Sequence, residues 1–165
     1  MIISTKGRYA LRFMIDLASH GDDACVNLKE IAARQEISVK YLEQIVIRLC
    51  HADLLVSVRG AHGGYCLTRK AKEYTVADIL AATECTLSPV SCLATEENTC
   101  PHREKCTTLP FWQKLNDIVL KYLRSTTLAQ LASGGSNKCP KRSRKTATGK
   151  KKAKSEKKAK SEPEA

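Results

Sequence analysis

Apolar residues recur at helical spacing along the first third of the chain. A first amphipathic helix is expected over residues 9–18, where the apolar positions are Ala10, Phe13, Met14 and Leu17, and Gly21 can end it. Asn27 followed by Glu30 resembles a capping box at the start of a short second helix. Ser38 is a plausible cap for a third helix, whose buried stripe is formed by Leu42, Ile45, Val46 and Leu49. Two short helices joined by a tight turn are typical of a helix-turn-helix.

The pattern after the third helix predicts a β-hairpin. Residues 55–58 and 65–68 have the composition of strands around a turn at 60–64. This hairpin would form a wing beside the helix-turn-helix. Thr75 with Asp78 then begins another short helix. The predicted fold class is mainly α with a small β-hairpin wing, a winged helix-turn-helix.

Helical periodicity is lost over residues 85–108 and returns in a long helix after Pro110, a residue suited to the first helical turn. The broad apolar stripe of this helix suits a partner helix from a second subunit, with packing inside one chain as the alternative; it consists of Trp112, Leu115, Ile118, Val119, Tyr122 and Leu123. These changes predict a DNA-binding winged helix-turn-helix at 1–84, a cysteine-rich loop at 85–108, a dimerisation helix with a short terminal helix at 109–134, and a disordered Lys-rich tail at 135–165.

Charge is distributed unevenly over the 165 residues, whose formal net charge is +11. Residues 1–72 hold 11 Lys and Arg against 7 Asp and Glu, residues 73–135 hold 5 against 7, and residues 136–165 hold 12 against 3. The tail, in which KKAKSE occurs twice in succession, is expected either to attract phosphates without sequence preference or to serve solubility alone. Charged residues interrupt the N-terminal apolar run, and no apolar stretch is long enough to span a membrane, so a cytoplasmic protein is expected.

The outward residues of the third helix are candidates for reading DNA. An α-helix fits the major groove, where each base pair presents its own pattern of donors and acceptors. Lys40, Tyr41 and Gln44 can donate to phosphates or base edges, as can Ser38, and Glu43 can accept from cytosine. Arg59 stands at the tip of the wing. The alternative is that these side chains form an ordinary solvated helix face.

Cysteines gather in the irregular loop. Cys92 and Cys100 have seven residues between them, and Cys100 and Cys106 have five. Soft thiolate ligands in a deformable loop favour an iron–sulfur cluster, and zinc or plain thiols are the alternatives. Three cysteines leave a fourth ligand to be supplied by His102, Glu104, Glu97, a partner subunit or solvent. A disulfide framework is not expected in a reducing compartment. Cys25, Cys50 and Cys66 are expected to be small buried hydrophobes. Cys85 fits either that group or the loop ligands, and Cys139, an expected exposed thiol of the tail, receives no role.

Four segments together resemble the Rrf2 family of bacterial winged-helix regulators, whose members include IscR-type iron–sulfur regulators and CymR-type regulators of cysteine metabolism. The segments are STKGRYALR, ISVKYLEQIVIRL, SVRGAHGGYCLTR and STTLAQLAS, and the resemblance covers about residues 1–134. It implies a homodimer centred on the long helix. It also implies DNA contacts from the residues named above, and from Lys6 and Arg8 near the DNA backbone.

The resemblance further implies that Cys92, Cys100 and Cys106 ligate an iron–sulfur cluster whose state tunes a transcription regulator, by family default a repressor. This chain departs from the IscR pattern, which has five residues between its first two cysteines and a histidine where this chain has Leu109. One alternative is a cluster-free regulator of sulfur metabolism, controlled by a partner protein. Another is an enzyme using Cys106 with His102, which is disfavoured because the loop offers no oxyanion device.

Overall fold

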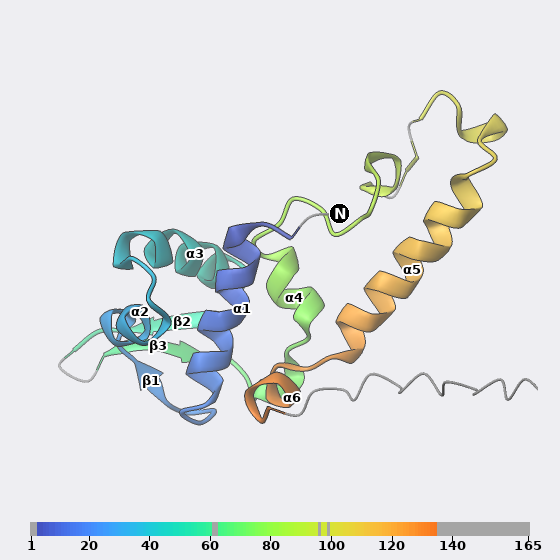
Figure 1. Cartoon of the computed structure of the whole chain (residues 1–165). Coiled ribbons are helices and arrows are strands. Elements are labelled where there is room, and N and C mark those ends of the chain that lie inside the picture. Colours follow the sequence, from blue (N-terminus) through green and yellow to red (C-terminus); the bar gives the residue numbers. More distant parts are fainter. Residues whose placement is uncertain (1–2, 61–62, 96, 99, 135–165) are drawn as a thin grey trace, which may run out of the picture.

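The computed structural model describes residues 3–60, 63–95, 97–98 and 100–134 (Figure 1). The predictions for the tail and for Cys139 therefore lie outside the described residues. In chain order the elements are α1 (Thr5–Ala18), β1 (Cys25–Val26), α2 (Leu28–Gln35), α3 (Val39–His51), β2 (Leu55–Val58), β3 (Gly64–Leu67), η1 (Ala71–Glu73), α4 (Val76–Ala81), η2 (Ser91–Leu93), η3 (Arg103–Lys105), α5 (Leu109–Ser125) and α6 (Leu128–Ala132). The fold class is as predicted, mainly helical with a small antiparallel sheet.

The first three helices begin at side-chain caps. Ser4 accepts from the amide of Gly7 at 3.2 Å, so α1 begins four residues earlier than its apolar pattern indicates. Asn27 caps α2 through the amide of Lys29 at 2.9 Å, rather than through the predicted partnership with Glu30. Ser38 caps α3 as predicted, by accepting from the amide of Tyr41. The buried faces of these helices meet in one core, to which α1 contributes Ala10, Phe13, Met14 and Leu17.

The sheet has three strands in the order β1-β3-β2, all antiparallel. The wing hairpin β2–β3 matches the prediction, with β3 one residue earlier than expected. The two-residue strand β1 was not predicted, because two residues are too few to show an alternating pattern. It places the entry to the helix-turn-helix directly beside the wing.

Tyr74 closes the core under the wing and is fully buried. Its hydroxyl donates to the carbonyl of Leu54 at 3.0 Å and accepts from the amides of Thr68 and Arg69 at 2.9 and 3.0 Å. A buried phenol is stable when its hydroxyl is paired in this way. Tyr74 therefore fixes the end of β3 to the residue that precedes β2.

The segment after α5 returns to the winged helix-turn-helix. Thr75 and Asp78 form the predicted capping box of α4. Next to it, the amide of Val76 donates to Thr126 and the amide of Leu128 donates to Tyr74, at 2.9 and 3.0 Å. Through this link α6 packs on α1, whereas α5 leans away from the body of the domain (Figure 1). No residue of α5 is buried within the described chain.

Candidate nucleic-acid interface and cysteine loop

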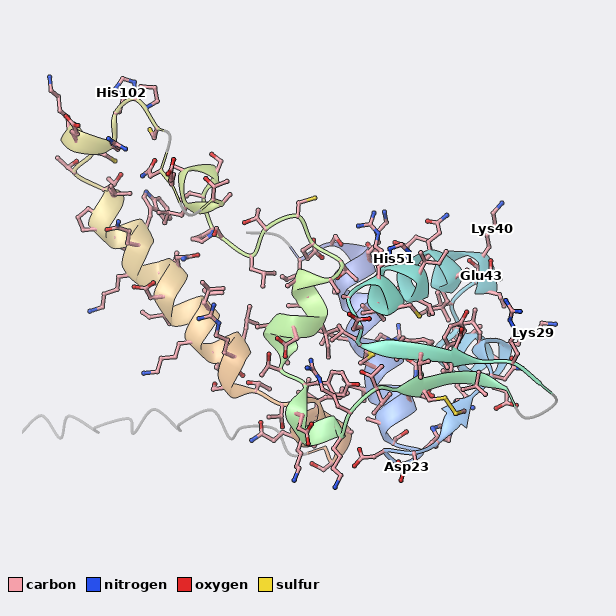
Figure 2. All side chains as sticks on the ribbon, turned by 180° about the vertical axis from the view of Figure 1, so that it is seen from behind. Asp23, Lys29, Lys40, Glu43, His51 and His102 are labelled. Atoms are coloured by element: carbon pink, nitrogen blue, oxygen red, sulfur yellow. A yellow bond between two sulfur atoms is a disulfide. The ribbon has the colours of Figure 1, made fainter. Side chains whose placement is uncertain are left out.

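The outer face of α3 presents the predicted DNA-reading residues to solvent, except for the half-buried Tyr41. Lys40, Glu43 and Gln44 are exposed, and Ser38 stands exposed at the helix start. Lys40 and Glu43 point outward at the end of the molecule remote from the cysteine loop (Figure 2). The opposite face of α3 is held in the core by Leu42, Ile45, Val46 and Leu49. A helix held along one face with polar side chains free on the other is able to enter a major groove.

The start of α1 lies next to the start of α3. The rings of Tyr9 and Tyr41 meet edge to face, with their centroids 5.8 Å apart. A hollow between the two helix starts is lined by Thr5, Tyr9, Glu36, Ile37, Ser38 and Tyr41. Helix N-termini carry partial positive charge, and two of them meet beside this hollow, which the carboxylate-bearing Glu36 also lines.

Lys6, Arg8 and Arg59 occupy the flanks of this face. Lys6 is half-buried, while Arg8 is exposed and donates to the hydroxyl of Thr5 at 3.1 Å. Arg59 is exposed at the end of β2, immediately before Gly60, whose φ of +127° favours glycine. The next two wing residues lie outside the described residues. Arg59 thus stands where the wing turns, as expected.

Two residues beside this candidate interface were not singled out from the sequence. Tyr9 contacts Tyr41, and Arg12 lies over the Tyr9 ring with its guanidinium carbon 5.6 Å from the centroid. Arg12 also donates to the side chain and the carbonyl of Gln35, at 2.9 and 2.8 Å. The signal that could have identified them is their spacing, because Thr5, Tyr9 and Arg12 follow one helix face beside the buried stripe.

The cysteine loop lies at the other end of the molecule from Lys40 and Glu43 (Figure 2). Cys92, Cys100 and Cys106 are half-buried free thiols, Cys85 is an exposed free thiol, and no described residue of 85–108 is buried. In the described part of the chain, no three His, Cys, Asp or Glu side chains are grouped closely enough to hold a metal ion. His102, one of the candidate fourth ligands, is exposed at the tip of the loop (Figure 2).

Cys106 has the local chemistry of a thiolate ligand. Its Sγ lies 3.4 Å from the hydroxyl of Thr108. That hydrogen bond, helped by the backbone amides of Thr108 and Leu109, holds the pKa of the Cys106 thiol below its ordinary value. By contrast, burial raises the pKa of the Cys50 thiol. The donor chemistry of the loop therefore fits a thiolate-bound cluster, while the loop does not hold its three thiols in a ready-made site.

Glu84 connects the start of the cysteine loop to α1. One of its carboxylate oxygens accepts from both the amide and the hydroxyl of Ser4, at 3.0 and 2.7 Å. Gly7 lies directly against the same oxygen, and a Cβ at this position would collide with it. The residue preceding Cys85 is thus bonded to the N-cap of the helix that carries Lys6 and Arg8.

The expectation of a small buried hydrophobe was wrong for Cys25, whereas for Cys66 the burial was confirmed but the disulfide was missed. Cys25 is exposed rather than buried, and it forms a disulfide with the buried Cys66 across β1 and β3. Both were expected among the small buried hydrophobes, because each falls in an apolar segment. The pairing joins residues 41 positions apart, which spacing along the chain does not indicate. Cys50, the third of that group, is free and half-buried.

Comparison with known proteins decides the family. A family model described as "Iron-dependent Transcriptional regulator", Rrf2, matches residues 3–134. The chain belongs to the Rrf2 family. It is therefore a DNA-binding transcription regulator and not an enzyme, as the sequence analysis expected. No described helix of this Rrf2 protein is both long and apolar enough to cross a membrane.

Relatives of both predicted types match this Rrf2 protein. Protein rrf2 of Nitratidesulfovibrio vulgaris is 41% identical over 142 residues, which cover 86% of this chain and 93% of the relative. The structure of CymR, described as the global cysteine regulator of B. subtilis, is 40% identical with a TM-score of 0.67, covering 81% of this chain and 98% of that one. The structure of T. potens IscR is 35% identical with a TM-score of 0.65, covering 82% and 89%.

Proposed function

We propose that this protein is a homodimeric repressor that reads DNA with α3 and the wing, and whose affinity depends on an iron–sulfur cluster held by Cys92, Cys100 and Cys106. The observation that carries the sensor part is the presence of three free, half-buried thiols in one loop, which begins directly after Glu84, the residue bonded to Ser4 at the cap of α1. The family description as iron-dependent and the IscR relatives support the same proposal.

Base reading is assigned to the exposed side chains of α3. Gln44 can pair with an adenine edge, Lys40 with guanine or phosphate, and Glu43 with the amino group of cytosine. Ser38 and Tyr41 lie at the hollow between α1 and α3, where a phosphate would meet two helix N-termini. Lys6, Arg8 and Arg59 would hold the flanking backbone and fix the register of the protein on the duplex.

Dimerisation is assigned to α5. This helix has 17 residues, a length of about 25 Å, and buries none of them in its own chain. Phe111, Ile118 and Tyr122 are all more than half exposed, at 62%, 57% and 58%. Such an apolar face is typical of a protein–protein interface. A second copy would cover it and would supply the second recognition helix that a two-half-site operator needs.

The three cysteines would hold the cluster, which when bound would supply covalent cross-links within the loop. Shortage of iron or oxidation of the cluster would remove these cross-links. The chain itself does the rest. Thr108 keeps the thiolate form of Cys106 available for ligation. Glu84 transmits the position of the loop to Ser4 at the cap of α1, and α1 contacts α3 through Tyr9 and Tyr41. Ordering of the loop would therefore change the placement of Lys6, Arg8 and the start of the recognition helix.

The experiment is the absorption spectrum, with iron and sulfide analysis, of protein purified without oxygen. We expect brown wild-type protein, and loss of colour and iron in Cys92→Ala. The control is Cys50→Ala, which removes a thiol outside the loop and should stay brown. Wild type that stays colourless and iron-free after reconstitution would overturn the cluster. That result would leave a DNA-binding dimer regulated by a partner protein, the alternative to which the CymR relatives point.

A further inference from the structure

Cys25 and Cys66 are directly opposed in neighbouring antiparallel strands. Their Cα atoms are 4.4 Å apart, and a disulfide joins them (Figure 2). Antiparallel residue pairs that exchange no backbone hydrogen bonds have Cα atoms about 4.5 Å apart, the arrangement in which side chains come closest. The same strand pairing would hold two thiols face to face, so the bond can form and break without rearranging the backbone.

The two sulfurs differ in access. Cys25 is exposed, whereas Cys66 is only 6% exposed. An oxidant in solution therefore meets Cys25 first, and Cys66 is positioned to attack the oxidised sulfur from inside the fold. Cys50, the remaining cysteine of this domain, is a free thiol in the described chain. The pair thus has the parts of a two-cysteine redox site, an exposed first thiol and an adjacent resolving thiol.

The disulfide encloses the DNA-reading elements. The closed loop from Cys25 to Cys66 contains α2, α3 and β2, and hence both the recognition helix and Arg59. Cys25 also lies two residues before Asn27, the cap of α2. The bond therefore fixes the entry of the helix-turn-helix to the inner strand of the wing.

We propose that Cys25 and Cys66 are a reversible dithiol–disulfide couple through which hydroperoxides act on the DNA-binding domain, separately from the loop cysteines. A bacterial transcription regulator meets its DNA in the reducing cytosol, where disulfides are usually transient and redox-sensing. The proposal rests on the DNA-binding function, but it does not depend on the cluster.

The chemistry balances with a hydroperoxide as the two-electron oxidant. The Cys25 thiolate attacks the peroxide oxygen, the O–O bond breaks, and Cys25 becomes a sulfenic acid while water or an alcohol leaves. The Cys66 sulfur then attacks the Cys25 sulfur, and the sulfenic hydroxyl leaves as water with the proton of the Cys66 thiol as the disulfide forms. A dithiol reductant reverses the reaction by two thiol exchanges and is itself oxidised to a disulfide.

Closure of the loop is expected to strengthen DNA binding. The disulfide excludes conformations in which α3 and the wing have moved apart. The domain therefore loses less conformational entropy when it binds DNA. It also raises thermal stability, because the cross-link restricts the unfolded chain across a long loop.

The test uses full-length protein as wild type, Cys25→Ser, Cys66→Ser and the matched control Cys50→Ser. Each is reduced with dithiothreitol, freed of reductant, and then treated with stoichiometric hydrogen peroxide. Disulfides are mapped by alkylation and peptide mass spectrometry, the Tm is recorded, and affinity is measured for a duplex selected from a random library by the reduced wild type.

We expect wild type and Cys50→Ser to form the 25–66 disulfide, to gain about 5 to 10 °C in Tm and to bind the duplex several-fold more tightly. Dithiothreitol should reverse all three changes.

The two serine variants in the pair should show none of these changes, although they keep the three loop cysteines. Peroxide-treated wild type without a 25–66 disulfide would overturn the couple. Equal or weaker DNA binding by the oxidised form, with the disulfide in place, would overturn its effect on DNA. If no duplex is enriched in the selection, the DNA-reading proposal fails instead, while mass spectrometry and the Tm still test the couple.

Discussion

Asp16 and Arg34 form an ion pair that joins α1 to α2, with Nη2 of Arg34 2.6 Å from Oδ1 of Asp16. Asp16 is only 7% exposed, and Gln35 adds a hydrogen bond to its other oxygen at 2.7 Å. Burial by itself would raise the pKa of Asp16, but the hydrogen bonds from Arg34 and Gln35 and the charge of Arg34 together bring it below its ordinary value. The first helix of the helix-turn-helix is thus attached to α1 by a charged contact at the edge of the core.

Asp16→Asn is expected to lower the free energy of unfolding by about 1 to 3 kcal/mol at neutral pH, since it removes a buried charge-assisted contact. Because the folded pKa of Asp16 is depressed, its contribution is complete above the unfolded pKa of about 4 and is lost as pH falls through the folded value. Urea unfolding of both proteins from pH 7 to pH 3 checks this, and the difference should shrink below about pH 4.

The matched control is Glu30→Gln, whose carboxylate is 65% exposed and lies 3.9 Å from the same arginine. Glu30→Gln should change the free energy of unfolding by no more than about 1 kcal/mol, as expected for a surface ion pair. Equal losses in the two variants would show that burial of Asp16 does not matter.

Glu84→Gln tests the connection between the loop and α1. The neutral amide weakens the two hydrogen bonds from Ser4, so loop ordering should reach α1 less effectively. We expect the ratio of operator affinities between cluster-loaded and cluster-free protein to fall towards one, with the absorption spectrum unchanged. Glu73→Gln, an exposed carboxylate in η1, is the control and should keep the wild-type ratio. A ratio that Glu84→Gln leaves unchanged would contradict the proposed connection.

Ile118→Lys tests the role of α5. The substitution places a charge on the apolar face, and in a two-fold symmetric dimer each subunit buries one such charge. The dimer dissociation constant should therefore rise by about 100-fold or more. Sedimentation equilibrium measures this. Circular dichroism should stay the same, because Ile118 is 57% exposed in one chain. Gln113→Lys adds the same charge at another exposed position of α5 and should leave the dimer intact. Dimers that withstand Ile118→Lys would rule out this face as the interface.

Thr108→Val tests the thiolate character of Cys106. Without the Thr108 hydroxyl the pKa of Cys106 should rise towards its ordinary value, which lowers the thiolate fraction near neutral pH. Alkylation of Cys106 by iodoacetamide in cluster-free protein, followed by mass spectrometry at pH 7, should therefore be slower. Thr107→Val makes the same change one residue earlier and should not slow the reaction. Unchanged alkylation in Thr108→Val would assign the lowered pKa to the backbone amides alone.

The sequence predicted the helix-turn-helix well, because its information is local. The stripe of α3 from Leu42 to Leu49 repeats over two turns, and Ser38 is a residue type that caps helices by bonding to nearby amides. The same period identified the exposed residues on its outer face. The start of α1 was missed because Thr5, Lys6 and Arg8 are polar and Gly7 disfavours helices, whereas Ser4 provides the cap.

The parts that could not be predicted depend on contacts between distant segments. The pairing of Cys25 with Cys66 needs β1 beside β3, and the bond from Glu84 to Ser4 spans 80 residues. The sequence located the loop cysteines but not their arrangement, because no described loop residue is buried and the core does not fix their positions. The contact between Tyr9 and Tyr41 was missed for a similar reason, since it depends on how α1 crosses α3.

The most direct test of the sensor proposal is the affinity of one anaerobic preparation for its selected operator duplex, before and after removal of the cluster by chelator. We predict a change of about 5- to 150-fold for wild type, and no change for Cys92→Ala treated in the same way. Equal affinities in the loaded and cluster-free wild type would contradict the claim that the cysteine loop controls DNA binding.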